Sequence, residues 1–222
     1  MSTLDRRRHL LPEMEGFSAR WYARQRGTPS QIAIVRRQAA RLTAAVQNGA
    51  VLEVAPGPGY LAIEIARLGR FQVTGLDISH TMVEISKENA AAAGVNIEFR
   101  QGDATEMPFA DGAFDLIVSQ AAFKNFRRPV SALNEMHRVL RSGGQAVIQD
   151  LRKEASAADI DREVKSQKVG AVSGFITKQI LAWLRSRAYS AGHFESLVAE
   201  CNFRTCEIKS DGIGLEVWLS RP

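Results

Sequence analysis

Three acidic residues in the first half of this 222-residue sequence have the type and spacing to bind a polar ligand: Glu53, Asp77 and Asp103. Each lies at or just beyond the end of an apolar run. The segment Pro56-Gly57-Pro58-Gly59 separates the first run from a helical pattern. Glycine lets a ligand approach the backbone closely, because no Cβ fills the space. The pattern predicts a binding site built on this loop and on the three acids.

The glycine-rich loop is compatible with more than one ligand. A phosphate-binding P-loop needs Lys and then Ser or Thr after its last glycine, whereas Tyr60 and Leu61 follow here. The dinucleotide pattern G-x-G-x-x-G/A is satisfied over residues 57–62, and Asp77 lies 18 residues beyond Gly59, where a ribose-binding acid belongs. A nicotinamide cofactor and another adenosine-bearing ligand both stay open on this motif alone.

The three acids together favour one adenosine-bearing ligand. Glu53 is placed to receive an ammonium group, Asp77 the ribose hydroxyls and Asp103 an exocyclic amine. S-adenosylmethionine has an amine, a ribose and an adenine in this order. It also carries a positive sulfonium and no phosphate, so the acids attract it where they would repel a pyrophosphate.

The elements that position these residues alternate between strand and helix. Buried strands are expected over 50–55, 71–76, 96–100, 114–119 and 145–150, and helices over 32–46, 60–68, 79–93 and 130–140. Ser79 is expected to cap the third of these helices at its start, and Gly94 to end it. This alternation is typical of a parallel, doubly wound sheet with helices on both faces.

The last third of the chain has a different pattern. Amphipathic stretches over 159–168 and 176–188 predict a helical insert, and another helix is expected over 190–201. Two strands joined by the turn residues 211–214 then predict an antiparallel hairpin. We expect one domain over 1–222, with a helical lid (1–45), a cofactor-binding core (46–150), an insert over the substrate pocket (151–190) and a closing helix and hairpin (191–222).

Composition narrows the class of protein. Hydrophobic residues make up 45% and charged residues 24% of the chain, as in ordinary globular proteins. No apolar stretch is long enough to span a bilayer, and two cysteines imply no disulfide framework, so a cytoplasmic location is expected. The net charge of +5 is mild and favours a solvated surface over a nucleic-acid partner. A homo-oligomer is compatible with all of this.

Four segments in order carry a resemblance to a known family. "LEVAPGPG", "GLDIS", "GDATEMPFADGAFDLIVS" and "ALNEMHRVLRSGG" resemble successive motifs of the class I S-adenosylmethionine-dependent methyltransferases. The stretch "AAFKNFRRPVSALNEMHRVLRSGG" is most similar to that of ubiquinone/menaquinone-biosynthesis C-methyltransferases. The resemblance covers roughly residues 45–150 and the final hairpin. It implies a Rossmann-like, mostly parallel seven-stranded sheet. Ala55 departs from the family pattern, which commonly has glycine there.

The resemblance implies a set of site residues, with S-adenosyl-L-methionine as cofactor and no metal. Gly57 and Gly59 would admit the methionyl part, and Ile78 would pack on the adenine. The full cofactor set is Glu53, Ala55, Pro56, Gly57, Gly59, Asp77, Ile78, Met82, Gly102, Asp103, Ala104, Gln120 and Ala121. Near the methyl group, the candidates for a catalytic role are Lys124, Asn125 and Tyr22.

The methyl acceptor is expected to be a small apolar or aromatic molecule, modified on oxygen or carbon. We expect the segment around Trp21 and Tyr22 to close with residues 170–188 over the methyl end of the cofactor. Trp183 would then belong to this roof, or alternatively to the core. A nucleic-acid methyltransferase is one alternative, although the loop after residue 119 lacks the Asn/Asp-Pro-Pro-aromatic pattern of amine methylases. A nicotinamide-dependent oxidoreductase is the second.

Overall fold

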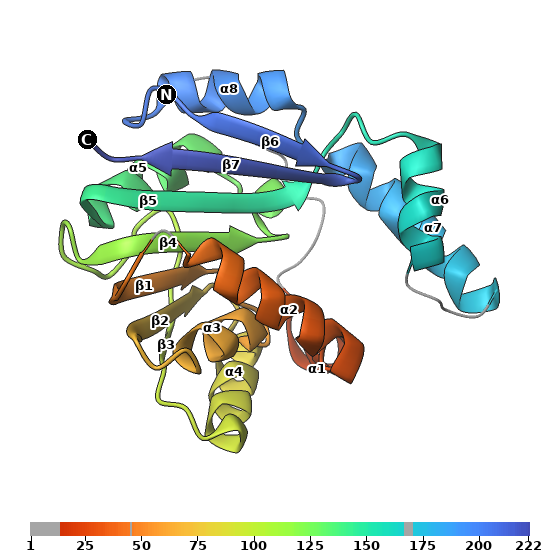
Figure 1. Cartoon of the computed structure of the whole chain (residues 1–222), viewed down its shortest axis with the longest axis horizontal. Helices are drawn as coiled ribbons and strands as arrows, with labels where there is room; N and C mark the ends of the chain where they lie inside the picture. Colours follow the sequence, from red (N-terminus) through yellow and green to blue (C-terminus); the bar gives the residue numbers. More distant parts are fainter. Residues whose placement is uncertain (1–13, 45, 167–170) are drawn as a thin grey trace.

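The computed structural model describes residues 14–44, 46–166 and 171–222 (Figure 1). Residues 1–13 of the expected lid, and residues 167–170 of the expected insert, lie outside the described residues. Residue 45, the last residue of the expected lid, also lies outside the described residues.

The centre of the molecule is a seven-stranded sheet with the order β3-β2-β1-β4-β5-β7-β6. Strands β1 to β5 run parallel, and β7 is antiparallel to both β5 and β6. The predicted fold is therefore confirmed, including the closing hairpin. The strands are β1 (Gly49–Val54), β2 (Phe71–Asp77), β3 (Glu98–Gln101), β4 (Phe114–Gln120), β5 (Leu140–Leu151), β6 (Glu207–Asp211) and β7 (Gly214–Ser220).

The helices lie close to the ranges expected from the sequence. They are α1 (Gly16–Arg26), α2 (Pro29–Leu42), α3 (Tyr60–Ala66), α4 (His80–Ala93), α5 (Pro129–Val139), α6 (Ala157–Ser166), α7 (Ala171–Arg187) and α8 (Ala191–Glu200), with a short 3-10 helix η2 (Phe123–Asn125). The expected caps of α4 are confirmed. The Ser79 hydroxyl accepts from the Met82 amide, and Gly94 adopts the left-handed conformation with φ of 68°.

Alternating residues of the central strands pack against two helical layers. Val51, Leu116 and their neighbours contact α2, α3 and α4 on one face. Leu52, Ile117 and Ile148 contact α5 and α8 on the other. Residues one position apart point to opposite faces of a strand, so Glu53 lies on the same face as Val51, toward α3.

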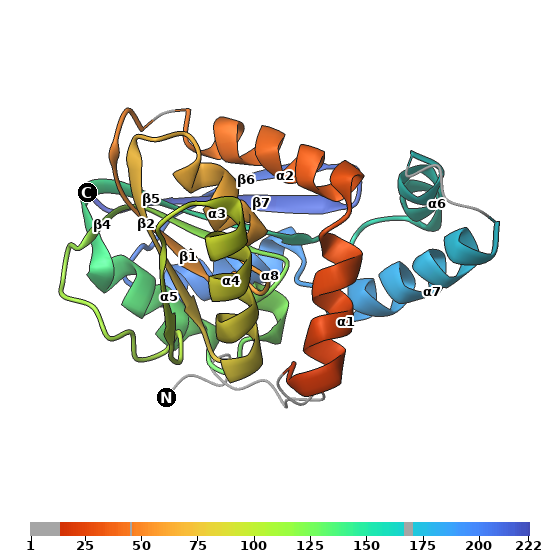
Figure 2. The ribbon, with the colours of Figure 1, turned by 90° about the horizontal axis from the view of Figure 1, so that it is seen from below.

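Two segments lie outside this three-layered body. Helix α1 packs against α4 and lies beside the carboxyl edge of the sheet. Helices α6 and α7 pack on each other and extend away from the sheet in both ribbon views (Figures 1 and 2). Of the helices in the described part of the chain, each is too short or too polar to cross a lipid bilayer.

Candidate active site

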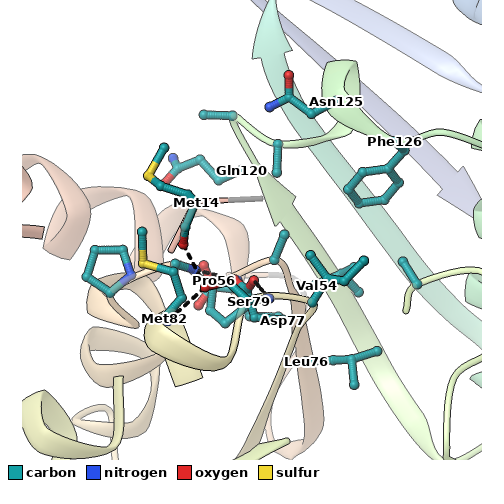
Figure 3. Close-up of a pocket in the computed structure, with 18 of the residues that line it drawn as sticks. Met14, Val54, Pro56, Leu76, Asp77, Ser79, Met82, Gln120, Asn125 and Phe126 are labelled. Atoms are coloured by element: carbon teal, nitrogen blue, oxygen red, sulfur yellow. Dashed lines mark hydrogen bonds between the residues drawn. The ribbon is translucent and has the colours of Figure 1, made fainter. Parts of the chain in front are cut away.

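A cavity of about 440 Å³ opens at the carboxyl ends of β1, β2 and β4 (Figure 3). The strand order reverses between β1 and β4, and α/β sheets of this kind bind ligands at such a point. All the residues predicted to bind the cofactor line this cavity except Gly59. Tyr22 and Asn125 also line it, whereas Lys124 does not.

Glu53 is a buried acid at the cavity wall. Its side chain is 2% exposed, and among the described residues its Oε2 has no hydrogen-bond partner. Burial raises the pKa of Glu53 to about 8; a hydrogen bond from the Ala62 amide acts against this rise, and the charge of Asp77 adds to it. A cationic group in the cavity would both neutralise the carboxylate and supply the missing donor.

Asp77 holds the glycine-rich loop in place. Its Oδ2 accepts from the Gly57 amide at 2.9 Å, and its Oδ1 accepts from the Ser79 amide at 3.0 Å. Burial raises the pKa of Asp77, against the lowering effect of these two bonds. A carboxylate offers about four acceptor positions. Two backbone bonds therefore leave capacity for a pair of ligand hydroxyls.

The two glycines of the loop have different roles. A Cβ on Gly57, which has φ of 54°, would face the cavity, with only Tyr22 Cε1 nearby at 4.0 Å. A Cβ on Gly59 would come within 2.9 Å of the Ser86 Cβ and 3.0 Å of Phe99 Cζ. Gly57 therefore leaves room for a ligand. Gly59 does not line the cavity, and its lack of a Cβ lets the loop pack on α4 and β3.

Two alanines in the cavity wall have strained backbones. Ala55 follows β1 with φ of 57°, and Ala121 follows β4 with φ of 58°. This left-handed region disfavours any residue with a Cβ, and such strain concentrates at functional sites. The departure from glycine at position 55 signalled the first in the sequence. Nothing in the sequence signalled the second.

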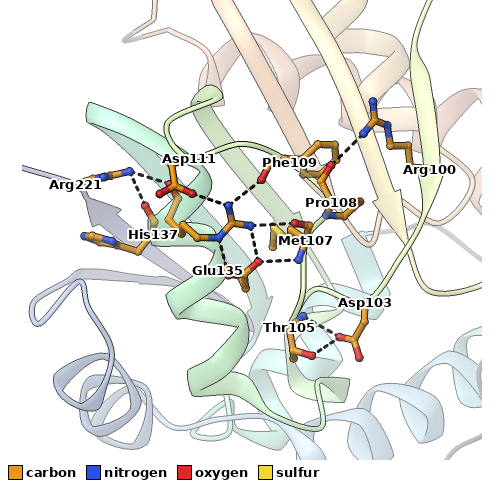
Figure 4. Close-up of polar contacts among 11 residues, drawn as sticks. Arg100, Asp103, Thr105, Met107, Pro108, Phe109, Asp111, Glu135, His137 and Arg221 are labelled. Carbon is orange, nitrogen blue, oxygen red and sulfur yellow. Dashed lines mark hydrogen bonds and ion pairs between the residues drawn. The ribbon is translucent and has the colours of Figure 1, made fainter.

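Asp103 lies on the loop between β3 and β4 and lines the cavity. Its Oδ1 accepts from the Thr105 amide and hydroxyl at 2.8 and 2.9 Å (Figure 4). Its other oxygen makes no hydrogen bond with the described residues. The side chain is exposed, and it is therefore accessible to a ligand amine.

The same loop is held by an ion pair that the sequence analysis missed. The Arg138 guanidinium binds Glu135 at 2.7 Å and donates to the carbonyls of Met107 and Phe109. Glu135 in turn accepts from the Met107 amide at 2.7 Å (Figure 4). The hydrogen bond from Arg138 lowers the pKa of Glu135. Both charged residues lie on α5, so this helix fixes the loop that carries Asp103.

Lys124 is a buried part of the scaffold. Its side chain is 4% exposed, and its Nζ donates to Asp150 Oδ1 at 2.8 Å and to the Ala121 carbonyl. The Lys124 amide also donates to Asp150 Oδ2 at 2.9 Å. An acceptor in the cavity would meet Asn125 and not Lys124, so the structure places Lys124 behind the site.

Helix α1 covers one side of the cavity. Met14, Tyr22 and Arg26 line it, and the Ser79 hydroxyl donates to the Met14 carbonyl at 2.7 Å (Figure 3). No described residue of the expected insert, 151–190, lines this cavity. Trp183 is 47% exposed, so it is not a core residue, and α1 and α7 lie apart in Figure 1.

A second, shallower cavity of about 570 Å³ adjoins the first and shares Arg26, Gln120 and Ala121 with it. A chain of polar contacts crosses it. Gln120 donates to Gln38 and to Gln149, and Gln149 donates to Glu216 at 2.6 Å.

Glu216 ends this chain as a paired carboxylate. Arg41 donates to both of its oxygens, at 3.0 and 2.5 Å. Burial alone would raise the pKa of Glu216, but hydrogen bonds from Arg41, Trp218 and Gln149 outweigh it and lower the pKa to about 2.

Comparison with known proteins agrees with this geometry. Residues 52–148 match the family model described as "Methyltransferase domain". The chain is 35% identical over 122 residues to the demethylmenaquinone methyltransferase of Deinococcus radiodurans, which covers 54% of this chain and 51% of that protein. It is also 35% identical over 117 residues to the ubiquinone/menaquinone biosynthesis C-methyltransferase of Geotalea uraniireducens, covering 51% and 50%.

A solved structure extends the likeness to the whole fold. A Methanococcus maripaludis protein, assigned as an S-adenosyl-L-methionine-dependent methyltransferase, superimposes with a TM-score of 0.73 over 97% of each chain, at 23% identity. The chain spans about half the length of the curated relatives it matches. Residues 52–148 are thus similar to a methyltransferase domain, and the whole chain shares the fold of a solved protein, in agreement with the resemblance found in the sequence.

Proposed function

We propose that this chain transfers the methyl group of S-adenosylmethionine to a small apolar or aromatic acceptor, on carbon or oxygen. The observation that carries the proposal is the buried carboxylate of Glu53, whose Oε2 lacks a partner beside an open glycine loop. It lies within the segment that matches a methyltransferase domain.

Each part of the cavity suits one part of the cofactor. Glu53 would accept from the methionyl ammonium and Asp77 from the ribose hydroxyls, while Gly57 admits the chain between them. Asp103 and the Ala104 amide would contact the adenine. The apolar surface for the ring comes from Ile78 and Met82, and Ala55, Pro56, Gly102, Gln120 and Ala121 complete the cavity wall.

The bound cofactor supplies an activated methyl group on a sulfonium, which an acceptor attacks in line. The protein's own contribution is to orient the acceptor and exclude water. Gln120 and Ala121 lie where the two cavities meet, so we propose that the acceptor reaches the methyl group there. Tyr22 and Asn125 are the predicted catalytic residues that line the cavity, and Lys124 positions η2 through Asp150.

The curated relatives support a small aromatic acceptor. Those quoted above are named for demethylmenaquinone and for ubiquinone or menaquinone biosynthesis. Neither alternative weighed from the sequence, nucleic-acid methylation or nicotinamide-dependent oxidation, gains support from these matches. We also propose that 1–222 works as one unit, in which the core 46–150 binds the cofactor and α1 covers it.

The test measures ligand binding first and transfer second. We expect S-adenosylhomocysteine to raise the melting temperature, because a ligand at 100 times its Kd adds about 2.7 kcal/mol of apparent stability. NADH is the control and should leave the melting temperature unchanged. Incubation with labelled S-adenosylmethionine and demethylmenaquinol, and separately with pooled cell extract and RNA, then identifies the acceptor by mass. Stabilisation by NADH alone, or label in RNA alone, would overturn the proposal.

A further inference from the structure

Exposed apolar side chains are concentrated on two helices. Among the described residues ten large apolar side chains are exposed, and six of them belong to α1 and α7. These six form what we call the aromatic faces: Phe17 (83% exposed) and Trp21 (52%) on α1, and Phe175 (65%), Ile176 (53%), Ile180 (46%) and Trp183 (47%) on α7. Such a concentration marks an interaction surface rather than scattered exposure.

The spacing places these residues on one side of each helix. Phe17 and Trp21 are four residues apart, one turn of α1. On α7, positions 175, 176, 180 and 183 fall on one face at helical spacing. The opposite side of α1, with Ala19 and Ala23, is buried against α4. The aromatic faces are therefore what these helices present outward.

The charge of the two helices is of one sign. Helix α1 contains Arg20, Arg24 and Arg26 and no acid, and α7 contains Lys178, Arg185 and Arg187 and no acid. Lys178 pairs with Asp161 of α6. The neighbouring α6, in contrast, carries both signs. Basic residues beside aromatic ones are the pattern of helices that lie in the interface of an anionic membrane.

We infer that the aromatic faces of α1 and α7 bind the surface of an anionic lipid bilayer, with the rings at the level of the headgroups. An anionic surface attracts each nearby Arg or Lys. A second copy of this chain would instead bring two acid-free basic helices face to face, which like charges oppose. Charge complementarity thus selects the lipid over a symmetric dimer.

The two aromatic faces belong to helices that lie close to the cofactor cavity. Helix α1 lines the cofactor cavity through Tyr22 and Arg26, and Arg187 of α7 contacts Asn125 at the cavity wall, at 3.5 Å. Docking through both helices would bring this opening close to the membrane surface. A lipid-soluble acceptor could then enter without crossing water. The inference goes beyond the proposed transfer, since it concerns binding to lipid alone.

The experiment is co-sedimentation with vesicles, without cofactor or acceptor. One set contains phosphatidylcholine alone and the other phosphatidylcholine with phosphatidylglycerol. We expect binding to the mixed vesicles, weakened by added salt, and little to the neutral ones. Phe17→Ser with Trp21→Ser, and Phe175→Ser with Trp183→Ser, should each lower the partition coefficient by about tenfold or more, because each pair removes two rings from the interface.

Matched controls separate lipid binding from folding and from dimerisation. Leu68→Ser removes an exposed apolar side chain (38%) outside both helices and should leave vesicle binding unchanged. All variants should keep the wild-type melting temperature and affinity for S-adenosylhomocysteine. The inference is overturned by absent vesicle binding, by equal binding to both vesicle types, by an equal loss in Leu68→Ser, or by a dimer in light scattering that the aromatic variants dissociate. None of these outcomes bears on methyl transfer.

Discussion

The carboxyl edge of the sheet has two halves, and the acidic side chains of the two halves differ in whether they pair with a cationic residue. On the β1–β2 half, Glu53 and Asp77 are buried without a cationic partner among the described residues, and burial raises both pKa values. On the β5–β7 half, Asp150 pairs with Lys124 at 2.8 Å, and Glu216 with Arg41 at 2.5 Å. The acids of the second half thus have positive partners within the protein, whereas those of the first half have none in the described part of the chain.

This difference separates a binding surface from a scaffold. A buried, unpaired carboxylate costs stability unless a ligand supplies the opposite charge. The unpaired acids of the β1–β2 half therefore suit a cationic ligand, in agreement with the sulfonium and ammonium of the proposed cofactor. The paired half needs no ligand, and its carboxylates hold η2 and α2 against the sheet.

The largest effect is expected from breaking the buried pair. Asp150→Ala leaves the Lys124 ammonium buried without its counter-charge, which we expect to lower the free energy of unfolding by about 3–5 kcal/mol. Urea denaturation followed by circular dichroism measures this loss. The exposed pair of Glu84 and Lys87 serves as the control, because Glu84→Ala should cost less than about 1 kcal/mol. Equal losses in both variants would show that the Asp150 pair is no more structural than a surface pair.

Substitutions in the β1–β2 half, which we call the ligand-directed half, should instead affect the affinity for the cofactor. We expect Asp77→Asn to weaken S-adenosylhomocysteine binding by about 100-fold, because two charge-assisted hydrogen bonds to the ribose are lost or inverted. Isothermal titration calorimetry gives the ratio. Asp103→Asn, at an exposed acid, should cost tenfold or less on the same scale (about 1.4 kcal/mol). An unchanged affinity in Asp77→Asn would mean that the ribose does not contact this carboxylate.

The part of the site that the sequence predicted depends on local rules. Glu53, Gly57 and Asp77 each follow from a strand end or a turn, and the order of strands brings them together. The pairing of Lys124 with Asp150, which lies 26 residues further on, could not be predicted in this way. No spacing in the sequence reveals that this lysine points inward to an acid on the next strand.

Packing decided the remaining differences. Gly59 was expected to admit the ligand, and the structure adds a packing role, because Phe99 and Ser86 from separate elements leave no space for a Cβ there. The periodicity of residues 176–188 correctly predicted a helix. Periodicity alone could not tell whether its apolar side was covered, and the structure leaves that side exposed.

A third prediction uses pH to compare Glu53 with Glu216. The pKa of Glu53 is about 8 in the folded protein, against 4.5 as its ordinary value. Between these values the folded state binds more protons than the unfolded state, so stability falls as pH rises from 4.5 to 8. We expect Glu53→Gln to flatten this decline, measured by urea denaturation across that range.

Glu216 should show the opposite sign. Its pKa of about 2 lies below the ordinary 4.5, so its contribution is present above pH 4.5 and is lost as pH falls toward 2. Glu216→Gln should therefore lower the free energy of unfolding at every pH above 4.5, and it should flatten the pH dependence only between about 4.5 and 2. Cofactor binding to ionised Glu53 should also release protons near pH 7, detected by calorimetry in buffers of different ionisation enthalpy. A pH profile unchanged by Glu53→Gln would remove the distinction between the two halves.

The smallest expected effect concerns the backbone at the ligand-directed half. Ala55 has φ of 57°, a conformation that costs an L-residue about 1–2 kcal/mol and glycine almost nothing. Glycine also lowers the free energy of unfolding by about 0.5–1 kcal/mol, because it increases the conformational freedom of the unfolded chain. Ala55→Gly should therefore stabilise the protein by about 0.5–1 kcal/mol, which corresponds to about 1–4 °C in Tm for a chain of this length.

The control for this change is a glycine placed where strain is absent. Ala90→Gly, within the buried side of α4, should destabilise the protein, since it loses helix propensity and a packed methyl group. The sign of the Ala55→Gly effect thus depends on the backbone and not on the residue type. If Ala55→Gly lowers Tm while cofactor affinity stays unchanged, the loop is not strained at this position. If it raises Tm and weakens cofactor binding, the strain preorganises the loop for the ligand, and the ligand-directed half of the edge holds its conformation at a measurable cost in stability.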